Sequence, residues 1–327
     1  MKNHADAIDF TQLFVTQASQ SSHDRRAESE IQLAIPSMQS VCGMENNMKK
    51  IYTEENNDIT VAGIQIFCNK RKCDMLQKAE EQMEKAVKTD NNIDLFVLPE
   101  QFYQMTCNNF NDEKYGEMPH QEFEIWVKHC AVKYNANIVA GTYSVITDNS
   151  QKVMNRCLVC DRKGNIVGFY DKIHLFDAFG IKESDTFAEG NSLGIFDLDI
   201  GRVGVWICYD SRFPEIARAL RAKGADILCV PAAFYRPNTD QWDILIKSAA
   251  ICNVTPVLAV NQYGDLPDGK GLFGRSMLVD AKGVVTAGMS DKEGFFIGKI
   301  DKTFTEKCRY ANPELNNRRK ELYREWL

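Results

Sequence analysis

The stretch GRVGVWICYDSRFPE, residues 201–215, changes from a strand pattern to a helix pattern around Cys208. Residues 203–207 are apolar or glycine throughout, which is typical of a strand covered on both faces. Residues 216–220 place apolar side chains at helical spacing, and Pro214 stands where the first turn of a helix tolerates proline. Because backbone N–H groups and the helix dipole favour a thiolate at a helix start, we interpret Cys208 as a nucleophile.

The composition describes an ordinary globular protein and argues against several classes of partner. Of the 327 residues, 44% are hydrophobic, and the formal net charge is −6. This negative charge argues against nucleic acid or an anionic membrane surface as the main partner. No apolar run reaches membrane-spanning length, and the first residues contain no apolar segment typical of a secretory signal.

The cysteines indicate a reducing compartment. The chain has 11 of them, an odd number, and several lie inside apolar runs. We interpret them as reduced core thiols of a cytoplasmic protein rather than as a disulfide framework. Cys157 and Cys160 fall in a predicted strand, where residues three apart do not share a face, so we assign them to the core and not to a zinc site.

Residues 1–58 differ from the rest of the chain. They are rich in Gln, Ser, Asn and charged residues, and they contain no convincing strand. We expect a partly disordered extension, or else an arm that packs on the domain or on a partner subunit. The organised domain spans residues 59–327 and ends in a charged tail with interspersed apolar residues, which we expect to dock.

The periodicity between residues 59 and 300 alternates between strands and helices. The first half predicts strands at 60–67, 93–99 and 138–144, helices at 74–88 and 121–134, and a hairpin of 155–161 with 166–170. The second half predicts strands at 193–199, 202–207, 227–231 and 256–261, helices at 213–223 and 240–253, a hairpin of 276–280 with 284–288, and a last strand at 295–300. This rhythm predicts an α/β fold in which two mixed sheets pack face to face with helices outside, a four-layer α-β-β-α sandwich.

Three polar residues stand just beyond apolar strands: Glu100, Lys172 and Cys208. Ligands of such sheets bind beyond the carboxyl ends of the strands. A thiol that attacks a carbonyl, a carboxylate that moves protons and an ammonium that stabilises an oxyanion form a set for acyl transfer. Taken singly, the three could be a turn cap, a surface ion pair and an inert core thiol, but together they favour function.

The segments around these three residues resemble the signatures of a known family. LPE at 98–100, YDKIHLFD at 170–177 and VWICYDSRFPE at 205–215 are similar to the three motifs of the nitrilase superfamily, the carbon–nitrogen hydrolases. FGRSM at 273–277 and the two arginines at 318 and 319 also match, and the resemblance covers about residues 59–323.

The resemblance implies an α-β-β-α sandwich that forms a homodimer or higher homo-oligomer, with no metal or organic cofactor. It makes Glu100 the general base and acid, Lys172 the stabiliser of the tetrahedral intermediate, and Cys208 the nucleophile. In the mechanism that follows, the backbone N–H of Tyr209 helps Lys172 to hold the oxyanion. The family has a second glutamate, which matches Glu183 here, and Glu189 in the same variable loop is the alternative.

The motif sequences look closest to those of amidases that act on amides of dicarboxylates, such as omega-amidases and deaminated-glutathione amidases. The expected reaction converts a small linear amide, such as a 2-oxo-dicarboxylate monoamide, to acid and ammonia through a cysteine thioester. Arg212 would pair with a substrate carboxylate or, equally, with a loop carboxylate. Five aromatic residues flank the motifs and could wall the pocket, although core packing is the default for each: Phe102, Tyr103, Phe179, Phe234 and Tyr235.

Two kinds of alternative stay open at this point. The same scaffold could serve an N-carbamoyl amide hydrolase, a nitrilase or an acyl transferase. The second alternative is a non-catalytic binding protein with the same fold. The presence of Glu100, Lys172 and Cys208 argues against this alternative.

Overall fold

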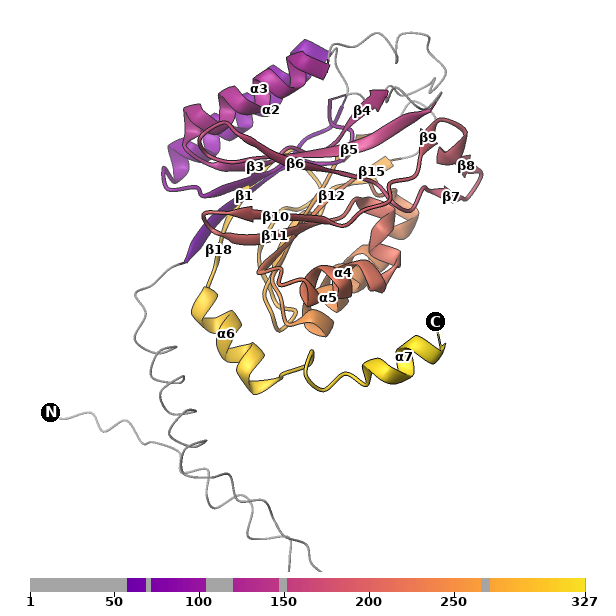
Figure 1. The fold of residues 1–327 in the computed structure, drawn as a ribbon. Helices are drawn as coiled ribbons and strands as arrows, with labels where there is room; N and C mark the ends of the chain where they lie inside the picture. The colour runs from indigo at the N-terminus through magenta and orange to yellow at the C-terminus, as the bar shows by residue number, and fades with distance from the viewer. Residues whose placement is uncertain (1–57, 69–71, 104–119, 147–151, 266–270, 327) are drawn as a thin grey trace, which may run out of the picture. The chain divides into compact units, whose positions relative to one another are not determined.

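The computed structural model describes residues 58–68, 72–103, 120–146, 152–265 and 271–326 (Figure 1). The extension predicted at residues 1–58 lies outside this part of the chain except for its last residue. The described residues form two main sheets that lie face to face, with helices on the outer face of each (Figure 1). The predicted four-layer α-β-β-α sandwich is therefore confirmed.

The first sheet consists, in the described residues, of β1 (Ile59–Gln65), β2 (Leu95–Val97), β3 (Asn137–Val139), β4 (Tyr143–Ile146), β5 (Val153–Cys160), β6 (Ile166–Asp171), β9 (Phe187–Ala188) and β18 (Gly294–Ile300). Its order is β18-β1-β2-β3-β5-β4, and β6 and β9 also pair with β5. The centre, β1 to β3, is parallel, while β18 and β5 pair antiparallel at its two sides. The last strand of the domain thus completes the sheet that its first strand begins.

The second sheet contains β10 (Gly194–Leu198), β11 (Gly201–Val205), β12 (Ile227–Ala232), β13 (Val257–Asn261), β16 (Met277–Val279) and β17 (Val285–Gly288) in this order. Its centre, β11 to β13, is parallel, and antiparallel strands flank it. Two short hairpins lie apart from the main sheets: β7 (Asp177–Ala178) with β8 (Ile181–Lys182), and β14 (Tyr263–Asp265) with β15 (Gly271–Phe273).

Two helices cover each sheet: α2 (Lys72–Thr89) and α3 (His120–Tyr134) the first, α4 (Pro214–Ala222) and α5 (Thr239–Asn253) the second (Figure 1). The residues of α2 that recur every three or four positions are fully buried: Met75, Ala79, Met83 and Ala86. The pattern that predicted this helix is therefore the pattern that packs it. In the described part of the chain, no helix combines the length and apolarity needed to cross a membrane.

Strand β1 divides its side chains between two cores, because successive side chains of a strand point to opposite faces. Val61 belongs to the core between the two sheets, whereas Ala62 and Ile64 belong to the core under α2 and α3. Gly63 also faces the core between the sheets, where a Cβ atom would lie 2.2 Å from the ring of Phe296 on the adjacent β18 and 3.0 Å from Val260 on the second sheet. The sheets therefore pack closely along β1.

The chain after β18 forms α6 (Lys302–Ala311) and α7 (Lys320–Trp326). Asp301 begins α6 as an N-cap, since its carboxylate accepts a hydrogen bond from the N–H of Phe304 at 2.6 Å. Arg309 donates to the carbonyl of Val254 at 3.1 Å, and Glu314 pairs with Arg221 at 3.3 Å. These contacts join residues 302–314 to the second half of the domain, and the docking of the whole tail stays a prediction.

One predicted strand is divided in the structure. The segment predicted at 138–144 ends as β3 at Val139 and resumes as β4 at Tyr143. Between them Gly141 has φ +63°, and a Cβ atom there would lie 2.2 Å from the carbonyl oxygen of Pro99. The chain turns here because only glycine fits both the angle and the close approach.

Candidate active site

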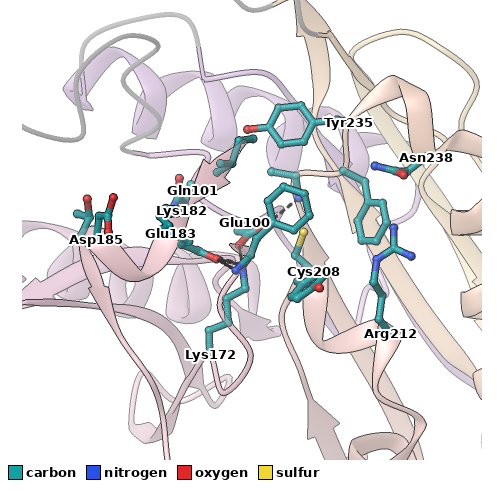
Figure 2. Close-up of a pocket in the computed structure, with 16 residues that line it drawn as sticks. Glu100, Gln101, Lys172, Lys182, Glu183, Asp185, Cys208, Arg212, Tyr235 and Asn238 are labelled. Atoms are coloured by element: carbon teal, nitrogen blue, oxygen red, sulfur yellow. Dashed lines mark hydrogen bonds and ion pairs between the residues drawn. The ribbon is translucent and has the colours of Figure 1, made fainter. Parts of the chain in front are cut away.

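The side chains of Glu100, Lys172 and Cys208 meet in one cavity of about 360 Å³ (Figure 2). Glu100 lies past the end of β2, and Lys172 directly follows β6 in the first sheet. Cys208 lies past the end of β11 in the second sheet. The cavity thus lies where the two sheets bring strand ends together, as expected for a ligand site in such folds.

Glu100 is buried, and both of its carboxylate oxygens are hydrogen-bonded. The residue exposes 3% of its surface to solvent. Oε1 accepts from Lys172 Nζ at 3.0 Å and from Asn155 Nδ2 at 2.9 Å, while Oε2 accepts from the N–H of Ala233 at 2.9 Å. Such bonds hold a carboxylate in one orientation and compensate for its removal from water.

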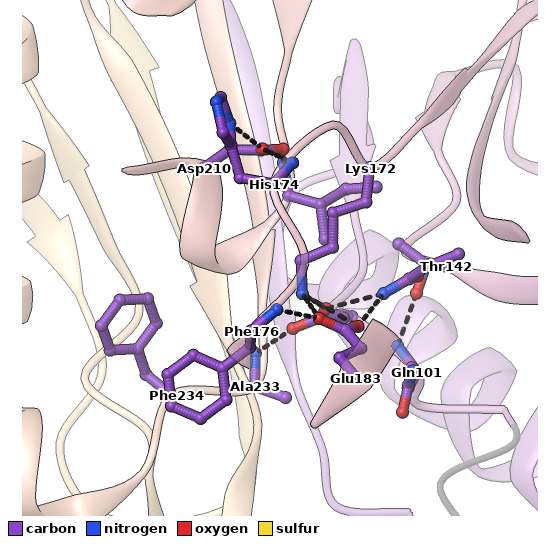
Figure 3. Close-up of polar contacts among 12 residues, drawn as sticks. Gln101, Thr142, Lys172, His174, Phe176, Glu183, Asp210, Ala233 and Phe234 are labelled. Atoms are coloured by element: carbon purple, nitrogen blue, oxygen red, sulfur yellow. Dashed lines mark hydrogen bonds and ion pairs between the residues drawn. The ribbon is translucent and has the colours of Figure 1, made fainter. Parts of the chain in front are cut away.

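Lys172 contacts two carboxylates, and Figure 3 shows its contact with that of Glu183. Its Nζ is 3.0 Å from Glu100 Oε1, 2.8 Å from Glu183 Oε2 and 3.1 Å from Glu183 Oε1. Burial alone would lower the pKa of Lys172, but Glu100, Glu183 and the Cys208 thiol raise it well above its ordinary value. The ammonium therefore keeps its charge, which an oxyanion would require.

Of the two glutamates that the sequence left as alternatives, Glu183 is the one at the cavity. It begins a short 3-10 helix, η3 (Glu183–Asp185), and its Oε2 also accepts from the N–H of Phe176 at 2.7 Å (Figure 3). Glu189 is exposed and does not line the cavity.

Cys208 stands at a bend in the chain rather than at the start of the long helix. The chain first forms a 3-10 helix, η4 (Cys208–Arg212), and α4 begins only at Pro214. Cys208 itself has φ +47°, an unfavourable angle for a residue with a Cβ atom. Strain of this kind is often found at functional sites.

The surroundings of Cys208 favour the thiol, contrary to the thiolate that the strand-to-helix pattern suggested. Burial and the nearby Glu100 carboxylate raise the pKa of Cys208 well above its ordinary value. Lys172 acts in the opposite direction but does not outweigh them. A base must therefore take the proton before the sulfur can attack, and the Glu100 carboxylate lines the same cavity.

Comparison with known proteins agrees with this geometry. The family model described as carbon-nitrogen hydrolase matches residues 59–310. The chain belongs to the carbon–nitrogen hydrolase family. It is similar to the deaminated glutathione amidase of Dictyostelium discoideum, with 33% identity over 80% of this chain and 94% of that protein. It is also similar to the 2-oxoglutaramate amidase of Bacillus subtilis, with 33% identity over 76% and 92% of the two chains.

The fold of this carbon–nitrogen hydrolase has a close counterpart among solved structures. Nit3 of Saccharomyces cerevisiae, a member of branch 10 of the nitrilase superfamily, superimposes with a TM-score of 0.73 at 28% identity, over 80% of this chain and 97% of Nit3. The resemblance read from the three motifs is therefore confirmed, and so is the assignment of the chain to enzymes that hydrolyse carbon–nitrogen bonds.

The six residues predicted around the pocket separate into three groups. Phe234, Tyr235 and Arg212 line the cavity of the hydrolase. Phe102 and Tyr103 do not, because Gln101 has φ +50° and the chain turns so that both rings pack in the core under α2 and α3. Phe179, in the turn between β7 and β8, is 76% exposed.

Two buried polar residues of the site were missed by reading the sequence. Asn155 donates to both glutamates, and Asp210 joins the cysteine segment to the lysine segment. Asp210 lies within a quoted motif and has the position of a helix N3 residue, which is a usable signal. Asn155 is a single amide in an apolar strand, and no local pattern distinguishes it.

Cys157 and Cys160 lie on opposite faces of β5. Cys157 packs in the core between the sheets and Cys160 in the core under the helices of the first sheet. They therefore cannot bind one metal ion together, and in the described residues no group of three or more metal-binding side chains comes together.

Proposed function

We propose that this hydrolase converts a small linear amide to its acid and ammonia through a thioester on Cys208, and that the substrate is the monoamide of a 2-oxo-dicarboxylate. The observation that carries the proposal is that Glu100, whose Oε1 lies 3.0 Å from Lys172 Nζ, lines one cavity together with Lys172 and Cys208. A base, a cation and a nucleophile gathered in one cavity are what acyl transfer requires.

In the first half-reaction, Glu100 takes the thiol proton as the sulfur attacks the amide carbonyl. Lys172 and the backbone N–H of Tyr209 stabilise the oxyanion, because N–H groups in the first turn of a helix have no partner within the helix. The protonated Glu100 then gives its proton to the departing nitrogen, and ammonia leaves. The elevated pKa of the Cys208 thiol supports the need for such a base.

In the second half-reaction, water replaces ammonia beside Glu100. Glu100 accepts a proton from this water, and the resulting hydroxide attacks the thioester carbonyl next to Lys172. The C–S bond breaks, the thiolate recovers the proton, and the acid is released. The Glu100 carboxylate thus serves as base and acid in both half-reactions. Glu183 keeps Lys172 in place through contacts of 2.8 and 3.1 Å with its Nζ.

Arg212 supports a substrate that carries a carboxylate. It lies with Asn238 at one end of the cavity, on one side of Cys208 (Figure 2). Its Nη2 is buried and has no hydrogen-bond partner within the described residues, so no loop carboxylate there neutralises it. A buried N–H group without an acceptor is costly, and a substrate carboxylate would supply the missing partner of Nη2.

The test is an ammonia-release assay over matched substrates. The panel contains a five-carbon 2-oxo-dicarboxylate monoamide, the saturated dicarboxylate monoamide, a neutral amide of equal length, the corresponding nitrile and an N-carbamoyl amino acid. We expect kcat/KM for the two acid amides to exceed that for the neutral amide by about 100-fold, the effect of one charged contact. Preference for the nitrile or the carbamoyl compound, or turnover by Cys208→Ala, would contradict the proposal.

Two broader features belong to the same proposal. Seven cysteines of the described residues form no disulfide, which supports a cytoplasmic location: Cys130, Cys157, Cys160, Cys208, Cys229, Cys252 and Cys308. The outer face of α5 exposes Ile244 by 67% and Ile251 by 50%, which supports association of two chains as a homodimer. Sedimentation analysis of the wild type and of Ile244→Glu would decide the second point.

A further inference from the structure

Asn155 contacts all three charged residues of the site. It lies on β5 with a side chain that is fully buried. Its Nδ2 donates to Glu100 Oε1 at 2.9 Å and to Glu183 Oε1 at 3.3 Å, and its backbone carbonyl accepts from the N–H of Lys172 at 3.0 Å. No other residue in the described part of the chain is recorded with hydrogen bonds to both glutamates and to Lys172.

The orientation of this amide follows from its neighbours. An amide nitrogen carries two protons and can serve two acceptors. Rotation of the amide by 180° would place Oδ1 against two carboxylates, which is repulsive. In the orientation observed, Oδ1 is buried without a hydrogen-bond partner. The chain therefore leaves an acceptor unsatisfied in order to direct both N–H groups at the glutamates, and such exceptions call for an explanation.

The explanation lies in the charge of the site. Glu100 and Glu183 share a single cation, since Lys172 Nζ is within 3.0 Å of each. Two carboxylates in such proximity tend to share a proton, and a protonated Glu100 could not act as a base. A neutral donor to both carboxylates reduces this repulsion without adding a second cation, which would weaken Glu100 as a base.

We propose that Asn155 is a positioning residue that donates one amide proton to each glutamate and so keeps Glu100 available as the proton acceptor for Cys208. The inference rests on the proposed function, in which Glu100 is that acceptor. The charged and titratable groups that face Glu100 in the described residues are Lys172, Glu183 and Cys208. Loss of the amide would leave Glu100 with Lys172 and the N–H of Ala233 as donors.

The test compares Asn155→Asp and Asn155→Leu with the wild type by the pH dependence of kcat/KM. Both variants keep the approximate shape of asparagine and remove the donors. Because a carboxylate that loses a donor takes up a proton at higher pH, we expect the acid limb of the profile to move up by about one pH unit or more. We expect KM to change by less than about threefold, because Asn155 does not line the cavity.

Asn137→Asp is the matched control. Asn137 is also fully buried, and its Nδ2 donates to Asp199 Oδ1 at 2.7 Å, away from the cavity. The control should lose stability but keep the wild-type acid limb. Folded Asn155 variants with an unshifted acid limb, or Asn155 variants that all fail to fold while Asn137→Asp folds, would overturn the proposal. Turnover by Glu100→Gln at the wild-type rate would instead overturn the function on which it rests.

Discussion

Asp210 Oδ1 lies 2.9 Å from both the backbone N and the ring Nδ1 of His174. This contact joins the segment that follows Lys172 to the turn that follows Cys208 (Figure 3). The other oxygen of Asp210 accepts from the Tyr170 hydroxyl at 2.7 Å and from the N–H of Ile207 at 3.0 Å. The buried Asp210 carboxylate therefore fixes the segment of Lys172 relative to the segment of Cys208.

Asp210→Asn should weaken this connection while keeping its shape. The asparagine amide has one acceptor oxygen in place of two. When its NH₂ group takes the place of Oδ2, the Tyr170 hydroxyl and the N–H of Ile207 lose their acceptor. We expect the free energy of unfolding to fall by about 2 kcal/mol, the worth of a hydrogen bond to a charged group. We also expect kcat to fall at least tenfold, as the geometry of Cys208 loosens.

Urea unfolding and initial rates check this expectation, with His174→Phe as the control. The phenyl ring keeps the stacking of His174 on Phe213, whose ring centroids are 3.6 Å apart, and the backbone N–H bond to Asp210 remains. Only the Nδ1 bond is lost, so the effect should be smaller. A larger loss for His174→Phe than for Asp210→Asn would contradict the role assigned to the carboxylate.

Lys172→Met should reduce both stability and activity. It leaves Glu100 and Glu183 buried without their cation, and breaking a buried pair costs about 3–5 kcal/mol. It also removes a stabiliser of the oxyanion, which lowers kcat by about 10²- to 10³-fold. Thermal unfolding and ammonia release measure the two effects.

Lys78→Met separates these two effects. Lys78 is buried as well, and it pairs with Glu293 and donates to the carbonyl of Phe67 at 3.0 Å, away from the cavity. We expect it to lose stability with little change in kcat. Equal losses of kcat in the two variants would mean that Lys172 acts through the fold alone.

The fold and the three central residues could be predicted because their signals are local. Glu100, Lys172 and Cys208 each lie within three residues of the end of a strand, and strand ends of such sheets converge. Asn155 and Asp210 act through residues 55 and 40 positions away, so their roles depend on the packing of strands and not on a neighbouring pattern. Phe102 illustrates the opposite error, because it is close to Glu100 in sequence but follows the turn at Gln101 into a core.

Arg212→Leu should affect substrates according to their charge. If Arg212 binds a carboxylate, its loss should lower kcat/KM for an acid amide by about 100-fold, equivalent to about 3 kcal/mol. A neutral amide of the same length should lose less than about threefold. Arg236→Leu is the control, because Arg236 pairs with Asp265 at 2.7 Å and does not line the cavity. A parallel loss for both amides in Arg212→Leu would rule out the carboxylate contact.

Stability should decline at alkaline pH because buried thiols keep their protons in the folded chain. Burial raises the pKa of Cys157 and Cys229, and burial with the nearby Asp161 raises that of Cys160 to about 11. A thiol of the unfolded chain ionises near pH 8.5. Above about pH 8.5, the loss of this proton therefore lowers the free energy of the unfolded state but not that of the folded state. Each such thiol then lowers the free energy of unfolding by up to about 1.4 kcal/mol per pH unit, and below pH 8.5 this decrease vanishes.

Urea unfolding at pH 7, 8.5 and 10 should therefore show a falling free energy of unfolding between the last two values. Cys229→Ala removes one of the buried thiols and should decline less steeply than the wild type. Cys252→Ala removes an exposed thiol and should follow the wild type. A slope unchanged in Cys229→Ala, or a stability that rises toward pH 10, would show that these thiols do not govern the alkaline limit of the fold.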